Sequence, residues 1–308
     1  FLKKKFYLKS NQIVFLVKTK KKYIKNLEIL NKYKFKIIEI NYKIKDYSKK
    51  EAEQLKKIKA NLLIIDRLGK VTKNFFEIIK NSYKKKIIID DSSLHRKLFD
   101  LSLNPLIQNV PDFNTSRIGY KYLILDDFKK NNIKIKKDIK NIFIFFGSFD
   151  SKKLTSRVIK SLEKINLRLN LIIPLTYKNI IKKLKSKHKI IFFKPEKYLS
   201  ELTKSNIAII AGGLSLFDAI LNKKKTICIP QYKHQEINAK KIFKMNAIKY
   251  LSPNNKKFNT TLVNLFLKIY KNKQYLKKIN TIQQGIINIR KINNTLRLIS
   301  NVYDKSKN

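Results

Sequence analysis

The chain alternates between short apolar runs and longer lysine-rich segments over most of its length. The first series of runs comprises QIVFLV (12–17), FKIIEI (35–40), NLLIID (61–66) and KIIIDD (86–91), with weaker candidates at LSLNP (101–105) and KYLIL (121–125). A second series comprises NIFIFFG (141–147), LNLIIP (169–174), KIIFFK (189–194), NIAIIAGG (206–213) and KTICIP (225–230). Runs of this length and composition are typical of strands buried in a parallel sheet.

The segments between these runs have the period of helices that cover a sheet. In 152–165 five apolar residues fall on one helical stripe: Leu154, Val158, Ile159, Leu162 and Ile165. Residues 126–140 lack an apolar face and are interpreted as a linker, whereas the tail from about residue 257 predicts a pair of helices over a second domain. The pattern therefore predicts an α/β protein with two doubly wound, Rossmann-like domains, residues 1–137 and 138–308.

The lysine excess changes this picture less than its size suggests. The chain has 71 Lys and Arg against 21 Asp and Glu, a formal net charge of +50, which favours a nucleic-acid or membrane-surface partner. The excess is nearly all lysine and comes with the other residues that A- and T-rich codons encode. The lysines also alternate with apolar residues instead of forming a basic arm. We therefore expect no specific nucleic-acid partner.

A single cysteine and three scattered histidines exclude a disulfide framework and indicate no metal site. Cys228 is predicted to be a core residue, and His95 and His188 to be exposed residues without a role. No apolar run approaches the roughly 18 residues of a membrane span, so we expect a cytoplasmic monomer without a cofactor. The chain begins with Phe1, and Met245 is its one methionine, so we expect a segment upstream.

Candidate chemistry gathers after the run at 206–213, where two of the six glycines are adjacent. Ligands of open α/β sheets bind beyond the carboxyl ends of the strands. There Gly212 and Gly213 would let the backbone approach a phosphate, which the start of the following helix also favours. Ser215 adds a hydroxyl, and Asp218, one turn on, is placed to accept hydrogen bonds from a ribose diol. Alternatively the pair is only a tight turn with Ser215 as the N-cap of the helix.

The next run ends at Pro230 and leads into HQEIN, which places His234, Gln235 and Asn238 on the same rim. This order of glycine pair, serine, acidic residue, strand ending in proline, HQ and NA resembles the C-terminal nucleotide-sugar domain of GT-B glycosyltransferases over residues 140–251. Elsewhere Asp90 and Asp91 could act as a carboxylate pair, but a turn-forming role is favoured.

Further segments resemble the UDP-sugar hydrolases of pseudaminic acid synthesis and the related spore-coat polysaccharide proteins. These segments are NLLIIDRLGKVTKNFFEIIKN, KKIIIDDSS, FDLSLNPL, IGYKYLILDDF and FIFFGSFDSKKLTSRVIKSL. The resemblance implies a GT-B-like fold whose two domains face a cleft. It assigns the following roles: Gly147 near the diphosphate; Gly212, Gly213 and Ser215 at the phosphates; Asp218 at the ribose; Gln235 and Asn238 at the diphosphate or sugar; Asp66 facing the cleft.

Three departures from this family keep the reaction open. The glycine-rich loop with the histidine that the resemblance makes the catalytic base has no counterpart and is expected upstream of residue 1, so the first domain is truncated. His234 stands where the hydrolases have Asn, and Leu68 where they have an aromatic residue. We expect a hydrolase that releases UDP and a free amino sugar from a UDP-2,4-diacetamido-2,4,6-trideoxyhexose. The alternatives are a family 28 type glycosyltransferase with a UDP-N-acetylhexosamine donor and a sugar-nucleotide-binding protein without activity.

Overall fold

The fold was analysed in a computed structural model that describes residues 9–19, 30–125, 140–287 and 289–307. The chain divides into two compact units, residues 1–126 with 293–308 and residues 127–292. The boundary expected at residue 137 and all but the last residue of the expected linker lie outside the described residues. Each unit is an α/β structure built on parallel strands, as the apolar runs predict.

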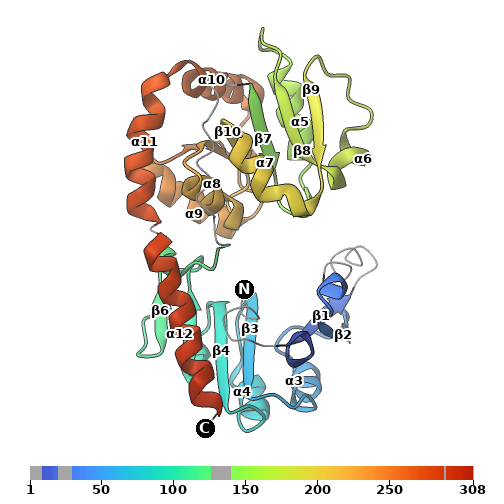
Figure 1. The fold of residues 1–308 in the computed structure, drawn as a ribbon, viewed down its shortest axis with the longest axis vertical. Coiled ribbons are helices and arrows are strands. Elements are labelled where there is room, and N and C mark those ends of the chain that lie inside the picture. Colours follow the sequence, from blue (N-terminus) through green and yellow to red (C-terminus); the bar gives the residue numbers. More distant parts are fainter. Residues whose placement is uncertain (1–8, 20–29, 126–139, 288, 308) are drawn as a thin grey trace. The chain divides into compact units, whose positions relative to one another are not determined.

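The described residues of the second unit form a parallel sheet of six strands, and Figure 1 labels β7, β8, β9 and β10 of it. The strands are β7 (Asn141–Phe145), β8 (Asn170–Pro174), β9 (Lys189–Phe193), β10 (Ile207–Ile210), β11 (Lys225–Cys228) and β12 (Lys249–Tyr250). Their order in the sheet is β12-β11-β10-β7-β8-β9. The chain thus adds strands in one direction from β7 and in the other from β10, which makes the β7–β10 boundary the topological switch point of a doubly wound sheet.

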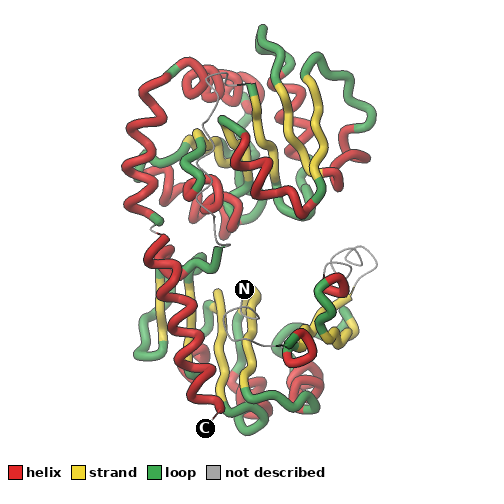
Figure 2. Tube along the Cα trace, in the orientation of Figure 1, coloured by secondary structure: helices red, strands yellow, loops and turns green. Residues whose placement is uncertain are grey.

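Helices cover both faces of this sheet (Figure 2). They are α5 (Leu154–Leu162), α6 (Lys178–Ile181), α7 (Tyr198–Lys204), α8 (Leu214–Leu221), α9 (Lys233–Lys244), α10 (Phe258–Lys271) and α11 (Lys273–Ile286). The stripe predicted for α5 is fully buried and packs with Ile142 and Ile144 of β7 in the main core cluster. The alternate residue Phe143 points to the other face, where its ring contacts Tyr198 of α7.

The first unit contains two parallel sheets. The four-stranded sheet consists, in chain order, of β3 (Leu62–Gly69), β4 (Lys85–Asp91), β5 (Leu101–Asn104) and β6 (Ser116–Ile118), and a separate pair consists of β1 (Val14–Thr19) and β2 (Lys36–Asn41). The prediction of a strand at 121–125 is wrong. The chain forms a 3-10 turn at Tyr120–Tyr122, and β6 lies just before this turn. Helices α3 (Lys49–Lys56) and α4 (Lys73–Ile79) start at the side-chain caps Ser48 and Thr72.

The helical tail corrects one expectation. Three helices follow residue 257 rather than two, and the last, α12 (Ile289–Lys307), returns to the first unit. Its Ile299 joins the core cluster of Ile87 and Leu103 on the four-stranded sheet, with Leu298 packed alongside. In this core cluster no described helix of residues 30–125 covers the face of the sheet. The apolar stripe of α12 packs there and buries that face.

Candidate functional site

Three loops of the second unit meet at the switch point of its sheet. Phe145 pairs with Ile210, so β7 and β10 end at the same level. The register continues into the loops, because Ala211 N donates to Phe145 O at 3.1 Å and Ile229 N donates to Ile210 O at 2.8 Å. The segments after β7, β10 and β11 therefore leave the sheet side by side, where doubly wound sheets bind ligands.

The three glycines at this edge differ in what an added side chain would meet. Gly147 has a φ of +88°, a conformation that side chains disfavour, and a Cβ there would have nothing within 4 Å. A Cβ on Gly212 would lie 2.5 Å from the carbonyl oxygen of Gln235, so Gly212 permits the close approach of α9. A Cβ on Gly213 would meet only Gln235 Nε2, at 3.5 Å. Of the pair, Gly213 is therefore the glycine at which a side chain would find room.

The start of α8 is suited to an anion. Gly213 is its N-cap and no side chain caps the helix, so the alternative in which Ser215 is the N-cap is wrong. Ser215 is the second helical residue and is buried. Uncapped amides at a helix start, together with the helix dipole, attract negative charge.

Helix α9 brings the HQEIN residues to the same edge. Gln235 Oε1 accepts a hydrogen bond from Gln231 N at 2.9 Å, and its Nε2 is the atom near Gly213. Asn238 is buried one turn later. The His234 ring stacks on Tyr232 with centroids 5.8 Å apart, and burial lowers the pKa of His234, which favours a neutral imidazole.

Gln231 was not singled out in the sequence, yet it links two of the three loops. Its buried side chain donates from Nε2 to the carbonyl oxygens of Phe146 and Phe149, in the segment after β7. Its Oε1 accepts a hydrogen bond from Ser151 Oγ at 3.1 Å. The position of a glutamine directly after Pro230 was the available signal.

Asp218 also has a partner that the sequence did not reveal. Tyr198 Oη donates to Asp218 Oδ2 at 2.9 Å, from the first residue of α7 to the second turn of α8. Both residues are half-buried. A carboxylate held in this way is suited to accepting hydrogen bonds from hydroxyl groups.

In the first unit, Asp66 lies in the second half of β3, and Asp90 is the residue before the last of the neighbouring strand β4. Asp90 Oδ1 accepts hydrogen bonds from the backbone amides of Leu106 and Ile107, and its φ of 55° is left-handed. Burial raises the pKa of Asp90 to about 6, and the nearby Asp66 charge adds to this. Asp66 is exposed, although desolvation by the protein around its carboxyl raises its pKa.

Asp91 has the turn-forming role that the sequence favoured. Its Oδ2 accepts a hydrogen bond from Val71 N at 2.7 Å, and its Oδ1 accepts from the amide and hydroxyl of Ser93. The carboxylates that influence one another here are thus Asp66 and Asp90.

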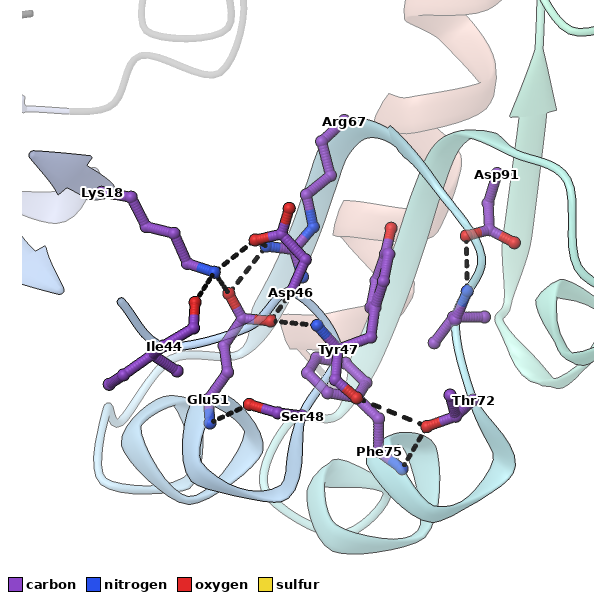
Figure 3. A network of polar contacts seen from close by, with 11 residues as sticks. Lys18, Ile44, Asp46, Tyr47, Ser48, Glu51, Arg67, Thr72, Phe75 and Asp91 are labelled. Atoms are coloured by element: carbon purple, nitrogen blue, oxygen red, sulfur yellow. Dashed lines mark hydrogen bonds and ion pairs between the residues drawn. The ribbon is translucent and has the colours of Figure 1, made fainter. Parts of the chain in front are cut away.

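A polar network holds the end of β3 (Figure 3). Buried Glu51 receives a bidentate bond from Arg67, at 2.7 and 2.6 Å, and an ion pair from Lys18 at 2.9 Å. Burial opposes ionisation of Glu51, but the hydrogen bonds from Arg67 and Lys18 prevail and lower its pKa. The Arg67 guanidinium also lies 4.0 Å from the centre of the Tyr47 ring. The network thus fixes the side chain of Arg67, the residue after Asp66 in β3.

The remaining candidates fall outside this edge. Cys228 is fully buried in β11, as expected for a core residue, and burial raises its pKa. The exposed position expected for His188 is wrong: its side chain is buried, and Nδ1 accepts a hydrogen bond from Leu169 N at 3.3 Å. His95 is half-buried. Among the described residues no group of three His, Cys, Asp or Glu side chains could hold a metal ion, and no described helix is long and apolar enough to cross a bilayer.

Comparison with known proteins finds a family model that matches the second unit. Residues 141–293 match the glycosyltransferase family 28 C-terminal domain. An uncharacterised protein of Methanocaldococcus jannaschii is 29% identical over 235 residues, which are 68% of this chain and 47% of that protein. The chain therefore spans about half the length of this curated relative.

Solved structures agree with the fold of both units. The crystal structure of Acinetobacter baumannii MurG has a TM-score of 0.66 and 14% identity, covering 97% of this chain and 94% of that one. The crystal structure of Arabidopsis thaliana UGT89C1 complexed with UDP-L-rhamnose has a TM-score of 0.60 and 12% identity, covering 99% of this chain and 94% of that one. Residues 141–293 are therefore similar to the glycosyltransferase family 28 C-terminal domain, and the chain has an α/β fold like that of these two solved glycosyltransferase-type structures.

Proposed function

We propose that the chain binds a UDP-activated amino sugar at the switch point of its second unit and hydrolyses the bond between the sugar and the diphosphate. The observation that carries this proposal is the meeting of the loops after β7, β10 and β11 at one sheet edge. Gly147, the open backbone of Gly213 and the uncapped start of α8 all lie there. The Arabidopsis protein of similar fold was solved in complex with UDP-L-rhamnose, a nucleotide sugar, which supports the same ligand class.

Each proposed contact follows from the chemistry of its group. The diphosphate would lie against Gly147, Gly212, Gly213 and Ser215, where backbone amides and the helix dipole favour its charge. Asp218 would accept hydrogen bonds from the ribose, and Gln235 and Asn238 would donate amide hydrogens to the diphosphate or the sugar. None of these contacts requires a metal ion.

In the proposed reaction, water attacks the anomeric carbon and gives its proton to a general base. The bond from that carbon to the diphosphate oxygen breaks, and UDP leaves with the electron pair. The charge that develops on the diphosphate is stabilised by the amides at the start of α8.

Glycosyl transfer is the second candidate. His234 precedes Gln235 here, which is the form that resembles the transferases, and the matching family is one of glycosyltransferases. The donor site would be the same, and an acceptor hydroxyl would replace water.

The decisive experiment supplies a UDP-linked diacetamido-trideoxyhexose in ¹⁸O-labelled water without an acceptor. We expect UDP and a free reducing sugar that carries ¹⁸O on its anomeric oxygen. Label found only on the phosphate would show P–O cleavage and contradict the mechanism. Turnover that begins only when a sugar or lipid acceptor is added would favour the transferase.

The donor site can be tested separately by calorimetry with UDP. Gly213→Val places a branched side chain on the open backbone, so UDP affinity should fall about tenfold or more while the fold is retained. Gly285→Ala is the matched control, since a Cβ there has nothing within 4 Å. Equal UDP affinity in all three proteins would mean that the glycine pair is only a turn.

A further inference from the structure

The Asp218 carboxylate is held by a residue whose position is fixed independently of it. The Tyr198 ring packs against Phe145 with centroids 4.9 Å apart and against Phe143 with centroids 5.6 Å apart. Phe143 in turn stacks on Phe193 at 5.2 Å. These contacts run across β7 and β9, so the sheet itself sets the direction of the Tyr198 hydroxyl.

The Tyr198 hydroxyl forms a hydrogen bond with the Asp218 carboxylate. It donates to Oδ2 at 2.9 Å, and a hydrogen bond to an ionised carboxylate is stronger than one between neutral groups. The terminal torsion of an aspartate has a broad energy minimum, so a fixed donor decides how the carboxylate plane is turned.

We propose that Tyr198 is a positioning residue that orients the Asp218 carboxylate for a ribose diol and thereby lets the site select ribonucleotides over deoxyribonucleotides. This inference rests on the proposed nucleotide-sugar function. A carboxylate can accept from both hydroxyls of a diol only when its plane faces them, and a 2′-deoxyribose offers one hydroxyl fewer. Loss of the orientation therefore weakens binding of a ribonucleotide more than binding of its deoxy counterpart.

The test compares the affinities of UDP and 2′-deoxy-UDP by calorimetry. We expect the native protein to prefer UDP by roughly tenfold, and Tyr198→Phe, which keeps the ring contacts, to reduce that ratio about fivefold. Asp218→Ala should remove most of the preference. Tyr198→Phe added to Asp218→Ala should then change the ratio no further, because the hydroxyl acts through the carboxylate.

Tyr250→Phe is a matched control. It deletes another hydroxyl that donates to a carboxylate, at 3.2 Å from Glu236 Oε1, and should leave the nucleotide ratio unchanged. An unchanged ratio in Tyr198→Phe, or an equal loss of affinity for both nucleotides, would overturn the positioning role while leaving the proposed function intact. A native protein that binds both nucleotides equally would also overturn it. Binding of neither nucleotide would overturn the proposed function itself, and the inference with it.

Discussion

At the scale of single residues, Asp90 lies in an environment that disfavours the charged form of its carboxyl group. Its carboxyl is buried, its φ of 55° lies in the left-handed region, and Asp66 lies near it. Burial and the neighbouring charge both disfavour the ionised form. Such unfavourable positions persist in native proteins mostly where function requires them.

We expect Asp90→Asn to stabilise the protein at pH 7 by about 1–3 kcal/mol. Asparagine keeps the oxygen that accepts from Leu106 and Ile107, tolerates a positive φ and removes the buried charge. The folded pKa is raised, so the penalty is absent below the unfolded pKa of about 4 and develops as the pH rises to about 6.

Urea unfolding of both proteins between pH 4 and 7 measures this effect. The free energy of unfolding of the variant should exceed that of the native protein by the full amount at pH 7, and the difference should vanish near pH 4. A variant that is less stable at pH 7 would show that the carboxylate itself holds the turn.

At the scale of secondary-structure elements, three buried lysines form hydrogen bonds with backbone carbonyls near the C-termini of helices. Lys86, Lys224 and Lys225 are each nearly inaccessible. Their ammonium groups donate to pairs of backbone carbonyls at or just beyond α4, α7 and α10: Lys80 and Tyr83, Thr203 and Ser205, Ile269 and Asn272. These carbonyls have no partner within a helix, and the dipole favours a cation there. In a chain with six glycines, lysine thus replaces the usual glycine cap.

For Lys224 we predict an unusual pH dependence of stability. Burial lowers its pKa to about 8, whereas the unfolded chain has the ordinary lysine pKa of 10.5. Between these values the unfolded state binds more protons, so the free energy of unfolding should rise with pH, by about 1–3 kcal/mol in total. Urea unfolding from pH 7.5 to 10.5 should show the rise in the native protein and not in Lys224→Met. The exposed Lys189→Met should keep it.

At the scale of the whole molecule, the chain begins and ends in the same unit. Helix α12 starts at the end of the second unit and packs Ile299 into the core of the first. The four-stranded sheet of the first unit therefore depends on residues at the opposite end of the sequence. The stability of each unit should respond to different residues of the helical tail.

Ile299→Ala should destabilise the first unit by about 2–4 kcal/mol, because it leaves a cavity beside Ile87 and Leu103. Hydrogen exchange should then speed up in β4 and β5 and stay unchanged in β7 and β10. Ile269→Ala in α10 is the matched variant and should show the reverse pattern, since Ile269 lies in the core of the second unit. Faster exchange in β7 for Ile299→Ala would contradict the assignment of α12 to the first unit.

The sequence alone located most of the described strands and the glycine pair. An apolar run of four to six residues is a local property, and it was correct for β3, β4, β7, β8 and β10 to within a few residues. It missed the two-residue strand β12 and misplaced β6, because short edge strands carry little pattern of their own. The resemblance to GT-B enzymes added the superfamily and the candidate residues, which stay predictions until ligand binding is measured.

Only the tertiary structure decided which distant residues act together. Tyr198 and Asp218 lie on different helices, Gln231 reaches back to a loop about eighty residues earlier, and Asp90 lies near Asp66 on a neighbouring strand. Sheet order and helix packing set these pairs. The burial of His188 and the packing of α12 on the first unit could likewise not be predicted from the local sequence. Sequence periodicity shows that a segment has a face to bury, and packing against the rest of the chain determines what that face meets.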